Sequence, residues 1–585
     1  MKILLVGVNA KYIHTGLAIR SLKKYSGFKE VELCEYTINH EKGFVISEIF
    51  KKKADVLAFS CYIWNINYIY EICSDLSKIL PETDIWLGGP EVSFDAEEVL
   101  KNHPYLKGVM RGEGEEIFKE LSSFYVKKET DLESIKGITY KEKDEIIKNP
   151  DMPLLNMDLL PFCYDEEEFN DKKIMYYEGS RGCPFSCSYC LSSLDKKVRF
   201  KSIDLVKKEL KIFIEKKVPQ VKFVDRTFNC SKKYTMAVWK FLVENDKGIT
   251  NFHFEIEADI LDDEEIELIN SMRPGLIQLE IGVQSTNDNT IKAINRRVEF
   301  SKIKKAVEKI AKNNNVHQHL DLIAGLPFEG FESFRKSYND VYSLKPNQLQ
   351  LGFLKVLKGS KMHEMAKEYG IKYQNKAPYE VLMTDFLSYD EIIKIKLVEE
   401  MTEVYYNSHQ FDTCLATINP QNTFDFFLNL GKYYDDKGLL EIKHKRVSRY
   451  EILIDYVKNE ALAEEKLLLE AADFDLYLRE NMKTRPAFSK SYSNEEKEII
   501  KEFYKKEAME HNLLKDYEKM DYKQLMRMTH IGIYSNDFTR ADADFKLDNE
   551  KKYYILFDYK NRSEIDYSAR VYLINDLLKG ETNVI

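Results

Sequence analysis

Gly182-Cys183-Pro184-Phe185-Ser186-Cys187-Ser188-Tyr189-Cys190 is the stretch on which the fold and the chemistry of this chain depend. It supplies three thiolates spaced C-x3-C-x2-C, and residues 176–181 before it have the pattern of a strand that runs into a loop. Thiolates are soft ligands that select zinc, copper(I) or iron–sulfur clusters. A structural zinc site would need a fourth ligand, and the nearest other cysteines are Cys163 and Cys230. Three cysteines on one short loop suit a 4Fe–4S cluster with one iron left open for a substrate or cofactor.

This loop, with the aromatic Tyr189 before its last cysteine, resembles the signature of the radical S-adenosylmethionine (radical SAM) enzymes. The resemblance implies that Cys183, Cys187 and Cys190 are the catalytic residues that hold the metal of the cluster, and that Tyr189 contacts the cofactor. It also implies that S-adenosylmethionine chelates the fourth iron and is cleaved by one electron to a 5′-deoxyadenosyl radical. The alternative reading of the same residues is a zinc knuckle or a chance cluster.

The composition is that of an ordinary globular protein, and it excludes several classes. At 585 residues the chain should hold roughly three or four domains of ~150 residues. A net charge of −10 argues against general nucleic-acid binding, which requires a basic surface. No apolar run approaches the ~18 residues of a membrane span. Nine cysteines without an export signal fit a reducing compartment, so we expect a cytoplasmic protein.

The first domain, residues 1–125, is expected to be an α/β domain with a doubly wound parallel sheet. Short apolar runs alternate with helical patterns, and this alternation predicts a parallel sheet with helices on both faces. The expected strands are residues 3–8, 31–35, 56–61, 85–87 and 108–110, with helices such as 68–80 and 96–102 between them.

Loops at the carboxyl ends of these strands should bind the ligand of this domain. None has the pattern G-x-G-x-x-G or that of a P-loop, so a nicotinamide or nucleoside triphosphate is not favoured. A phosphoreceiver is also unfavoured, because the third strand ends without an acceptor aspartate. The candidate cofactor-binding residues on these loops are Asn9, Ser60, Gly88, Gly89, Pro90, Gly112 and Glu113.

In front of a radical SAM motif, this domain resembles the cobalamin-binding domain of the cobalamin-dependent radical SAM enzymes, which commonly carry Gly-Gly-Pro and Gly-Glu-Gly-Glu turns like 88–90 and 112–115. Other cobalamin domains coordinate cobalt through the histidine of D-x-H-x-x-G, whereas His14 has neither that aspartate nor that spacing. The resemblance therefore implies base-off cobalamin with no histidine ligand. The alternative is a flavodoxin-like domain without a cofactor.

A second iron–sulfur cluster on Cys34, Cys61 and Cys73, as in the methylthiotransferases, is a rival interpretation. Cys73 sits in a helical pattern, and none of the three has the sequence context of that family. Three separate buried cysteines are the favoured interpretation.

Residues 126–172 read as a linker with a hairpin at 138–148. Residues 173–370 again alternate strands and helices, and the resemblance implies a partial (β/α)6 radical SAM barrel. Its reacting groups should lie at the carboxyl ends of the strands. The expected strands are 221–224, 252–257, 276–282, 319–323 and 350–355, with helices such as 203–216 and 301–312.

Polar residues gather at these strand ends. By resemblance to the motifs of the family, the expected S-adenosylmethionine-binding residues are Asp225, Glu257, Gln284, Ser285 and Gly325. For any one of them the alternative is a residue that fills or caps the barrel.

His317, His319 and Asp321 share one strand face at period two. Nothing near them in the sequence completes a metal site, so a structural or substrate-facing role is favoured. Cys230 is expected to be a free thiol.

Residues 371–585 are expected to form a mostly helical α+β domain, weakly similar to an uncharacterised domain that follows some cobalamin-dependent radical SAM proteins. Capping boxes at Ser388-x-x-Glu391 and Ser493-x-x-Glu496 open two helices, and 466–479 is a third. Residues 553–559 and 570–574 read as strands.

The resemblance implies an enzyme that uses a 4Fe–4S cluster, S-adenosylmethionine and cobalamin, and that methylates an unactivated carbon of an unknown substrate. It also implies an electron donor such as flavodoxin or ferredoxin. One alternative is a radical SAM enzyme without cobalamin that performs a rearrangement, a cyclisation or a methylthiolation. Another is a non-catalytic protein that binds a cluster or a corrinoid.

Overall fold

The computed structural model describes residues 1–170, 173–540, 545–546, 550–563 and 567–578. The last two residues of the expected linker and the end of the expected C-terminal domain therefore lie outside the described residues. No helix in the described ranges combines the length and apolar character that crossing a bilayer requires.

The chain divides into two compact units, each described here by itself. The first comprises residues 1–337 and 351–392, and the second comprises residues 338–350 and 393–585.

The first unit contains a seven-stranded sheet in the order β2-β1-β3-β4-β5-β6-β7. The first five strands are parallel. Their bounds are β1 Ile3–Asn9, β2 Val31–Thr37, β3 Val56–Ser60, β4 Asp84–Gly88 and β5 Gly108–Met110. The helices that connect them or follow them are α1 Leu17–Ser26, α2 Lys42–Lys52, α3 Ile66–Ile79, α4 Pro90–Ser93, α5 Ala96–Asn102 and α6 Gly114–Lys127.

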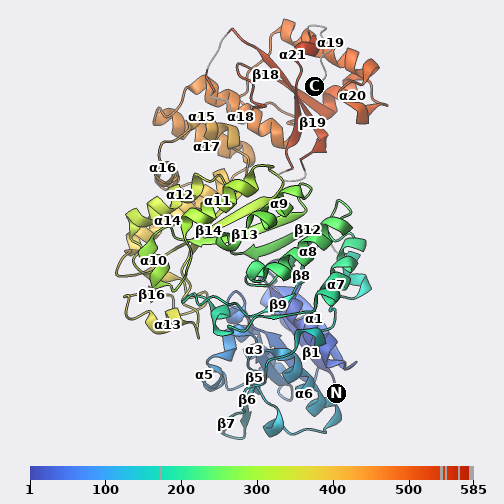
Figure 1. Ribbon diagram of the computed structural model, residues 1–585, viewed down its shortest axis with the longest axis vertical. Helices are drawn as coiled ribbons and strands as arrows, with labels where there is room; N and C mark the ends of the chain where they lie inside the picture. The colour runs from blue at the N-terminus through green and yellow to red at the C-terminus, as the bar shows by residue number, and fades with distance from the viewer. Residues whose placement is uncertain (171–172, 541–544, 547–549, 564–566, 579–585) are drawn as a thin grey trace. The chain divides into compact units, whose positions relative to one another are not determined.

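Helices cover both faces of this sheet, as the near-continuous apolar strands predict. On one face, Ile3 and Leu5 of β1 pack with Ile19 of α1 and Phe118 of α6. On the other face, strand residues pack with α2, α3 and α5. In Figure 1, α1 and α6 lie on one side of the sheet and α3 and α5 on the other. The predicted doubly wound sheet is confirmed.

The hairpin expected at 138–148 forms β6 Ile138–Glu142 and β7 Glu145–Lys148. Strand β6 pairs antiparallel with β5, so the hairpin extends the sheet of the first domain. The burial of Ile138 and Tyr140 against the core of α6 explains this attachment.

A second, six-stranded sheet in this unit has the order β15-β14-β13-β12-β11-β8. It is open, with β8 and β15 at its edges, and its described strands do not close into a full barrel. The bounds are β8 Met175–Tyr177, β11 Gln220–Phe223, β12 Asn251–Ile256, β13 Ile277–Gln284, β14 His317–Ala324 and β15 Gln348–Phe353. The helices of this part are α7 Ile203–Glu215, α8 Lys232–Asn245, α9 Asp263–Ser271, α10 Asp288–Ala293, α11 Phe300–Ala311 and α12 Phe331–Tyr342. The predicted alternation of parallel strands and helices is confirmed.

The two faces of this second sheet differ in chemistry. Residues such as Phe223, Phe254 and Leu279 are fully buried. The residues that alternate with them are polar, and the parallel register aligns Glu255, Glu280 and His319 in one row. Side chains in register point to the same face, so one face of the sheet carries charged groups.

The cysteine loop is closed by a short antiparallel ribbon of β9 Ser180–Arg181 and β10 Arg199–Phe200. Arg181 faces Arg199 across this ribbon, and Ser180 faces Phe200. The ribbon therefore forms the base of a loop that contains all three cysteines. The unit also contains α13 Lys361–Met365 and the hairpin of β16 Lys372–Tyr373 and β17 Val381–Met383.

The second unit is mostly helical, as predicted. Its α14 Tyr389–Met401, which begins in the first unit, opens with the predicted capping contacts, since the amide of Glu391 donates to Ser388 and the amide of Ser388 donates to Glu391. The further helices are α15 Asp412–Ile418, α16 Thr423–Asp436, α17 Arg446–Asn459, α18 Glu465–Arg479, α19 Asn494–Glu510, α20 Tyr522–Met528 and α21 Asn575–Leu578.

An antiparallel sheet in the order β18-β19-β20 packs with α19 and α20. Strands β19 Tyr553–Arg562 and β20 Ala569–Leu573 were expected, whereas β18 Thr529–Tyr534 was not. Gly532 in its centre weakens the strand signal of the sequence.

Candidate active site

A cavity of about 660 Å³ opens at the carboxyl ends of the first sheet. All seven candidate residues on the strand-end loops line it: Asn9, Ser60, Gly88, Gly89, Pro90, Gly112 and Glu113. The opposite wall comes from the second sheet and the cysteine loop, through Tyr176, Arg181, Gly182 and Arg226. The sequence thus predicted one wall of the cavity and not the other.

Backbone geometry explains why glycine stands on this wall. Gly89 has a φ of 116°, and a Cβ there would lie 2.5 Å from the carbonyl oxygen of Cys61. Gly112 has a φ of 81°. Both conformations favour glycine, which also lets a ligand approach the backbone.

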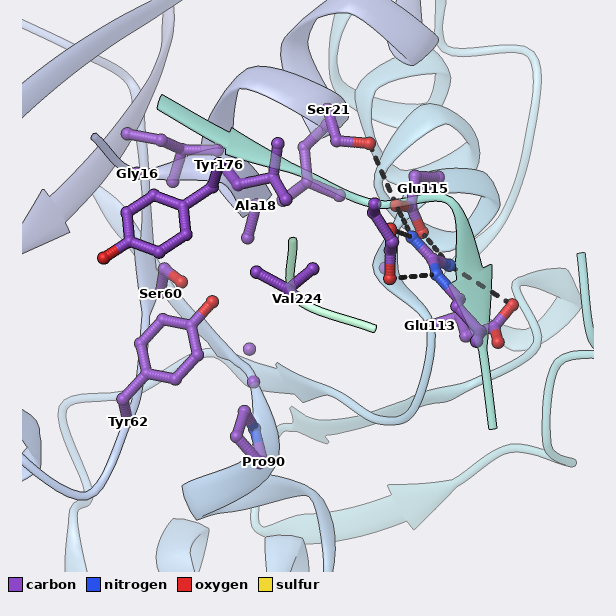
Figure 2. Close-up of a pocket in the computed structure, with 18 of the residues that line it drawn as sticks. Gly16, Ala18, Ser21, Ser60, Tyr62, Pro90, Glu113, Glu115, Tyr176 and Val224 are labelled. Carbon is purple, nitrogen blue, oxygen red and sulfur yellow. Dashed lines mark hydrogen bonds and ion pairs between the residues drawn. The ribbon is translucent and has the colours of Figure 1, made fainter. Parts of the chain in front are cut away.

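Asn65 and the rings of Tyr62 and Trp64 are site elements that the sequence did not reveal. The Asn65 amide donates to the carbonyls of Val8 and Ser60, at 2.9 and 3.0 Å, and fixes the loop after β3. Tyr62 lines the cavity and stacks on Trp64 with ring centroids 4.4 Å apart. Figure 2 shows Tyr62 and Tyr176 across the cavity from Glu113 and Glu115.

His14 also lines the cavity. Its Nδ1 lies 2.7 Å from the hydroxyl of Tyr176, so this ring nitrogen is engaged by the first strand of the second sheet. Burial lowers the pKa of His14, and the charges of Lys11 and Lys222 lower it further.

The three cysteines of the motif lie on the loop above the β9–β10 ribbon. The Cys183 amide donates to the carbonyl of Asp195, and the Cys190 amide donates to that of Cys187. In the described part of the chain, one group of three or more candidate metal ligands has its donor atoms within 4.8 Å of one another, and it does not include these cysteines. Three thiolates on one loop are the kind of ligand that holds an iron–sulfur cluster.

Burial raises the pKa of the Cys187 thiol, and the charge of Arg296 opposes that rise. Arg296 is a site residue that the sequence analysis missed. Its guanidinium donates to the hydroxyl of Tyr189 at 3.1 Å, to Glu257 at 2.6 Å and to the carbonyl of Gly282 at 2.7 Å. It thus joins the cysteine loop to the ends of β12 and β13.

Two buried acceptors beside Arg296 have no hydrogen-bond partner among the described residues, Glu257 Oε1 and Gln284 Oε1. Gln284 has a φ of 69° at a bulge that ends β13. An orphaned buried acceptor costs free energy, so these atoms suit the donors of a bound ligand.

Three of the expected S-adenosylmethionine-binding residues make contacts within the protein: Asp225, Ser285 and Gly325. Asp225 is fully buried and accepts from the Gly179 amide at 2.8 Å and the Ser180 hydroxyl at 2.6 Å. Ser285 donates to buried Glu329 at 2.7 Å. Gly325 has a φ of 88° and would clash with Val381 if it carried a Cβ.

The charged face of the second sheet carries a second group of interest. Glu280 accepts from Lys222 at 3.0 Å and lies 2.9 Å from His253 Nε2. Burial alone would raise the pKa of Glu280, but His253 and Lys222 hold it well below its usual range. Burial raises the pKa of Glu255 to about 7.

Glu280, His319 and Asp321 each present a donor atom within 4.8 Å of the others, the one such group in the described chain. The sequence showed His319 and Asp321 on one strand face. It could not show that Glu280 of the neighbouring strand joins them.

Cys34, Cys61 and Cys73 of the first domain are not part of a group of candidate metal ligands among the described residues. Cys61 and Cys73 are buried in one apolar cluster, and Cys34 packs against it. Burial raises the pKa of Cys34 to about 11, which disfavours a thiolate ligand.

Three family models match the chain. The B12 binding domain matches residues 3–122, the radical SAM superfamily matches residues 177–341, and a protein of unknown function, DUF4080, matches residues 367–557.

Individual relatives match parts of the chain. An uncharacterised methyltransferase of Pyrococcus horikoshii is 31% identical over 206 residues, which are 33% of this chain and 44% of that protein. The cobalamin-dependent radical SAM methyltransferase TokK of Streptomyces tokunonensis is 23% identical over 405 residues, which are 65% of this chain and 59% of TokK. The chain thus spans about half the length of the curated relatives it matches.

A solved structure has the same fold. The cobalamin-dependent S-adenosylmethionine radical enzyme OxsB, with aqua-cobalamin and S-adenosylmethionine bound, aligns with 81% of this chain and 78% of its own, with a TM-score of 0.56 and 14% identity. The chain therefore carries a B12-binding domain, a radical SAM domain and the domain DUF4080, in that order.

Proposed function

We propose that the protein is a cobalamin-dependent radical SAM enzyme that methylates an unactivated carbon. The observation that carries this proposal is the shared cavity, because Arg181 and Gly182 of the cysteine loop line the same space as Gly88 and Gly89 of the B12-binding domain. When bound, the cluster supplies one electron to S-adenosylmethionine, which yields the hydrogen-abstracting group, and cobalamin carries the methyl group.

Cys183, Cys187 and Cys190 would hold three irons and leave the fourth for S-adenosylmethionine. The unpartnered oxygens of Glu257 and Gln284 fit the amine or hydroxyl donors of that ligand. Arg296 orients Glu257, so the carboxylate keeps one oxygen for the ligand. Asp225 would act on the backbone that leads into the loop.

We assign cobalamin to the wall of the cavity that Gly89 and Gly112 line, because glycine lets a large ligand approach the backbone. We propose base-off binding without a histidine on cobalt. Among the described lining residues His14 is the one histidine, and its Nδ1 is engaged by Tyr176. Cob(II)alamin bound to the wild type and to His14→Ala should then give the same electron paramagnetic resonance spectrum, without splitting by a nitrogen on cobalt. A nitrogen splitting that is present in the wild type and lost in His14→Ala would contradict this.

The proposal also includes a partner and a compartment. A cluster that must be reduced needs an electron donor such as flavodoxin or ferredoxin. None of the nine cysteines, all of which lie in the described ranges, forms a disulfide, which fits a cytoplasmic protein.

Anaerobic reconstitution tests the proposal. The wild type should bind iron and sulfide, take up hydroxocobalamin and cleave S-adenosylmethionine reductively to 5′-deoxyadenosine, and Cys187→Ala should abolish the cleavage. Zinc in place of iron would overturn it.

Mass spectrometry with a deuterated methyl donor decides the reaction type. A product that carries the label supports methyl transfer. An unlabelled product with 5′-deoxyadenosine formed would point to a rearrangement or cyclisation instead.

A further inference from the structure

Two glutamates of the Gly112-Glu113-Gly114-Glu115 turn in the B12-binding domain pair with arginines of the ribbon that closes the cysteine loop. Glu115 accepts hydrogen bonds from both terminal nitrogens of Arg181, at 2.6 and 3.1 Å. Glu113 accepts hydrogen bonds from both terminal nitrogens of Arg199. Bidentate arginine–carboxylate pairs are strong and geometrically specific.

These two arginines need a counter-charge. They are register partners on β9 and β10, and like charges directly opposite each other destabilise an antiparallel pair. Glu178 neutralises part of the charge of Arg181, at 2.9 Å. The remaining carboxylates that face the pair are Glu113 and Glu115, together with Asp195 at 2.9 Å from Arg199.

The pairs are well shielded from water. The side chains of Glu115 and Arg181 are 6% and 15% exposed. Burial alone would raise the pKa of Glu115, but Arg181 and a hydrogen bond from Ser21 lower it, so the carboxylate stays ionised. Removing one partner of a buried pair leaves an uncompensated charge.

The ribbon leads directly into the cluster ligands. Arg181 precedes Gly182, which has a φ of 94°, and a Cβ on Gly182 would lie 2.8 Å from the carbonyl of Lys197. The Cys183 amide is held by the carbonyl of Asp195. A shift of the ribbon would therefore move Cys183.

We propose that Glu113 and Glu115 form a clamp that positions the cysteine loop through Arg199 and Arg181, so that the B12-binding domain sets where the cluster ligands lie. Both glutamates are then positioning residues, and Glu113 holds the loop where the sequence pattern suggested a corrinoid contact. The identity of the bound groups rests on the proposed function, but the clamp itself does not.

Limited trypsin digestion of the protein without added cofactors tests the clamp, because Lys196 and Lys197 are exposed within the loop. Glu115→Gln and Arg181→Lys should each speed cleavage at these lysines about tenfold, through local opening of the ribbon. The matched control is Tyr125→Phe, at the other end of the same helix, which breaks the buried contacts to Trp86 and Asp84. Cleavage in both clamp variants at the rate of this control would overturn the proposal.

Reconstituted protein gives a second readout. Both variants should release iron to a chelator about tenfold faster than Tyr125→Phe, while their affinity for hydroxocobalamin stays within about twofold of wild type. Unchanged iron release with tenfold weaker hydroxocobalamin binding would make the turn a corrinoid contact instead. If Glu115→Gln does not fold, Arg181→Lys, which keeps the charge, decides alone. Failure of the wild type to bind iron would count against the proposed function, and the digestion would still report on the clamp.

Discussion

At the scale of single residues, burial separates neighbours that look alike in the sequence. Arg296 and Arg297 are adjacent, yet Arg296 is buried with three partners and Arg297 is exposed. Arg296 is remote in sequence from its partners Tyr189 and Glu257. A single sequence cannot show which arginine turns inward, and for this reason the sequence analysis named residues at the strand ends but missed Arg296.

Arg296→Gln should therefore lower stability and weaken ligand binding at the site, whereas the same change at the adjacent Arg297 should not. The change leaves Glu257 as a buried charge without its cation, which costs about 3–5 kcal/mol. We expect a lower unfolding temperature and weaker S-adenosylmethionine binding, measured by calorimetry. Arg297→Gln should leave both unchanged, and equal effects in the two variants would contradict the assignment.

Asp225 should make stability depend on pH. Burial raises its pKa from 3.8 to about 7 despite the hydrogen bonds from Ser180 and Gly179. The folded state thus binds this proton more tightly than the unfolded state, so the stabilisation is full below pH 3.8 and is lost as the pH rises through 7. Each pKa unit corresponds to about 1.4 kcal/mol.

Asp225→Asn cannot titrate and should flatten this dependence. Between pH 5 and 8 the wild type should lose stability relative to the variant, by up to a few kcal/mol. Urea unfolding at several pH values measures the difference, in which other titrating groups cancel. Parallel curves for the two proteins would show that Asp225 does not titrate in this range.

At the scale of elements, local patterns predicted the strands, and long-range pairing decided their use. The hairpin β6–β7 was recognised from its turn, but its attachment to β5 depends on a partner strand that lies some 30 residues earlier. The ribbon of β9 and β10 was not recognised, since each strand has two residues and the pairing spans the whole cysteine loop. The row of Glu255, Glu280 and His319 likewise exists only through sheet register.

Gly182→Ala tests how closely that loop is held. The residue needs a φ of 94°, and its new Cβ would lie 2.8 and 2.9 Å from the backbone carbonyls of Lys197 and Asp195. Backbone atoms cannot move aside as a flexible side chain can, so the cost should exceed the ~1–2 kcal/mol of a left-handed residue alone. We expect most of the iron to be lost after reconstitution, as measured by iron content per chain.

Gly248→Ala is the matched control, because Gly248 has a φ of 74° and nothing within 4 Å of the added Cβ. It should lose only the strain energy and retain iron. If Gly182→Ala keeps as much iron as this control, the loop tolerates the displacement and does not depend on the contact.

At the scale of the whole molecule, the units do not follow the sequence order of the expected domains. Residues 338–350, which run from the second half of α12 into the first half of β15, belong to the second unit. Tyr338 is fully buried there, with its hydroxyl 2.8 Å from that of Thr402. Asn339 binds the amide of Phe424 in the same unit. The boundary expected at residue 370 could not anticipate this, because the anchoring residues meet only after folding.

A chain that ends at residue 392 should therefore fail to fold cooperatively, since it retains residues 338–350 without the rest of their unit. Its heat-capacity trace should lack a sharp transition, and it should bind a dye for exposed apolar surface. Tyr338→Phe in the full chain removes only the hydroxyl contact and should cost about 1 kcal/mol, with a single lowered transition. A truncated chain with a sharp transition would mean that the segment folds without its unit, and deletion of the C-terminal domain would then become a clean way to measure what DUF4080 adds to substrate binding.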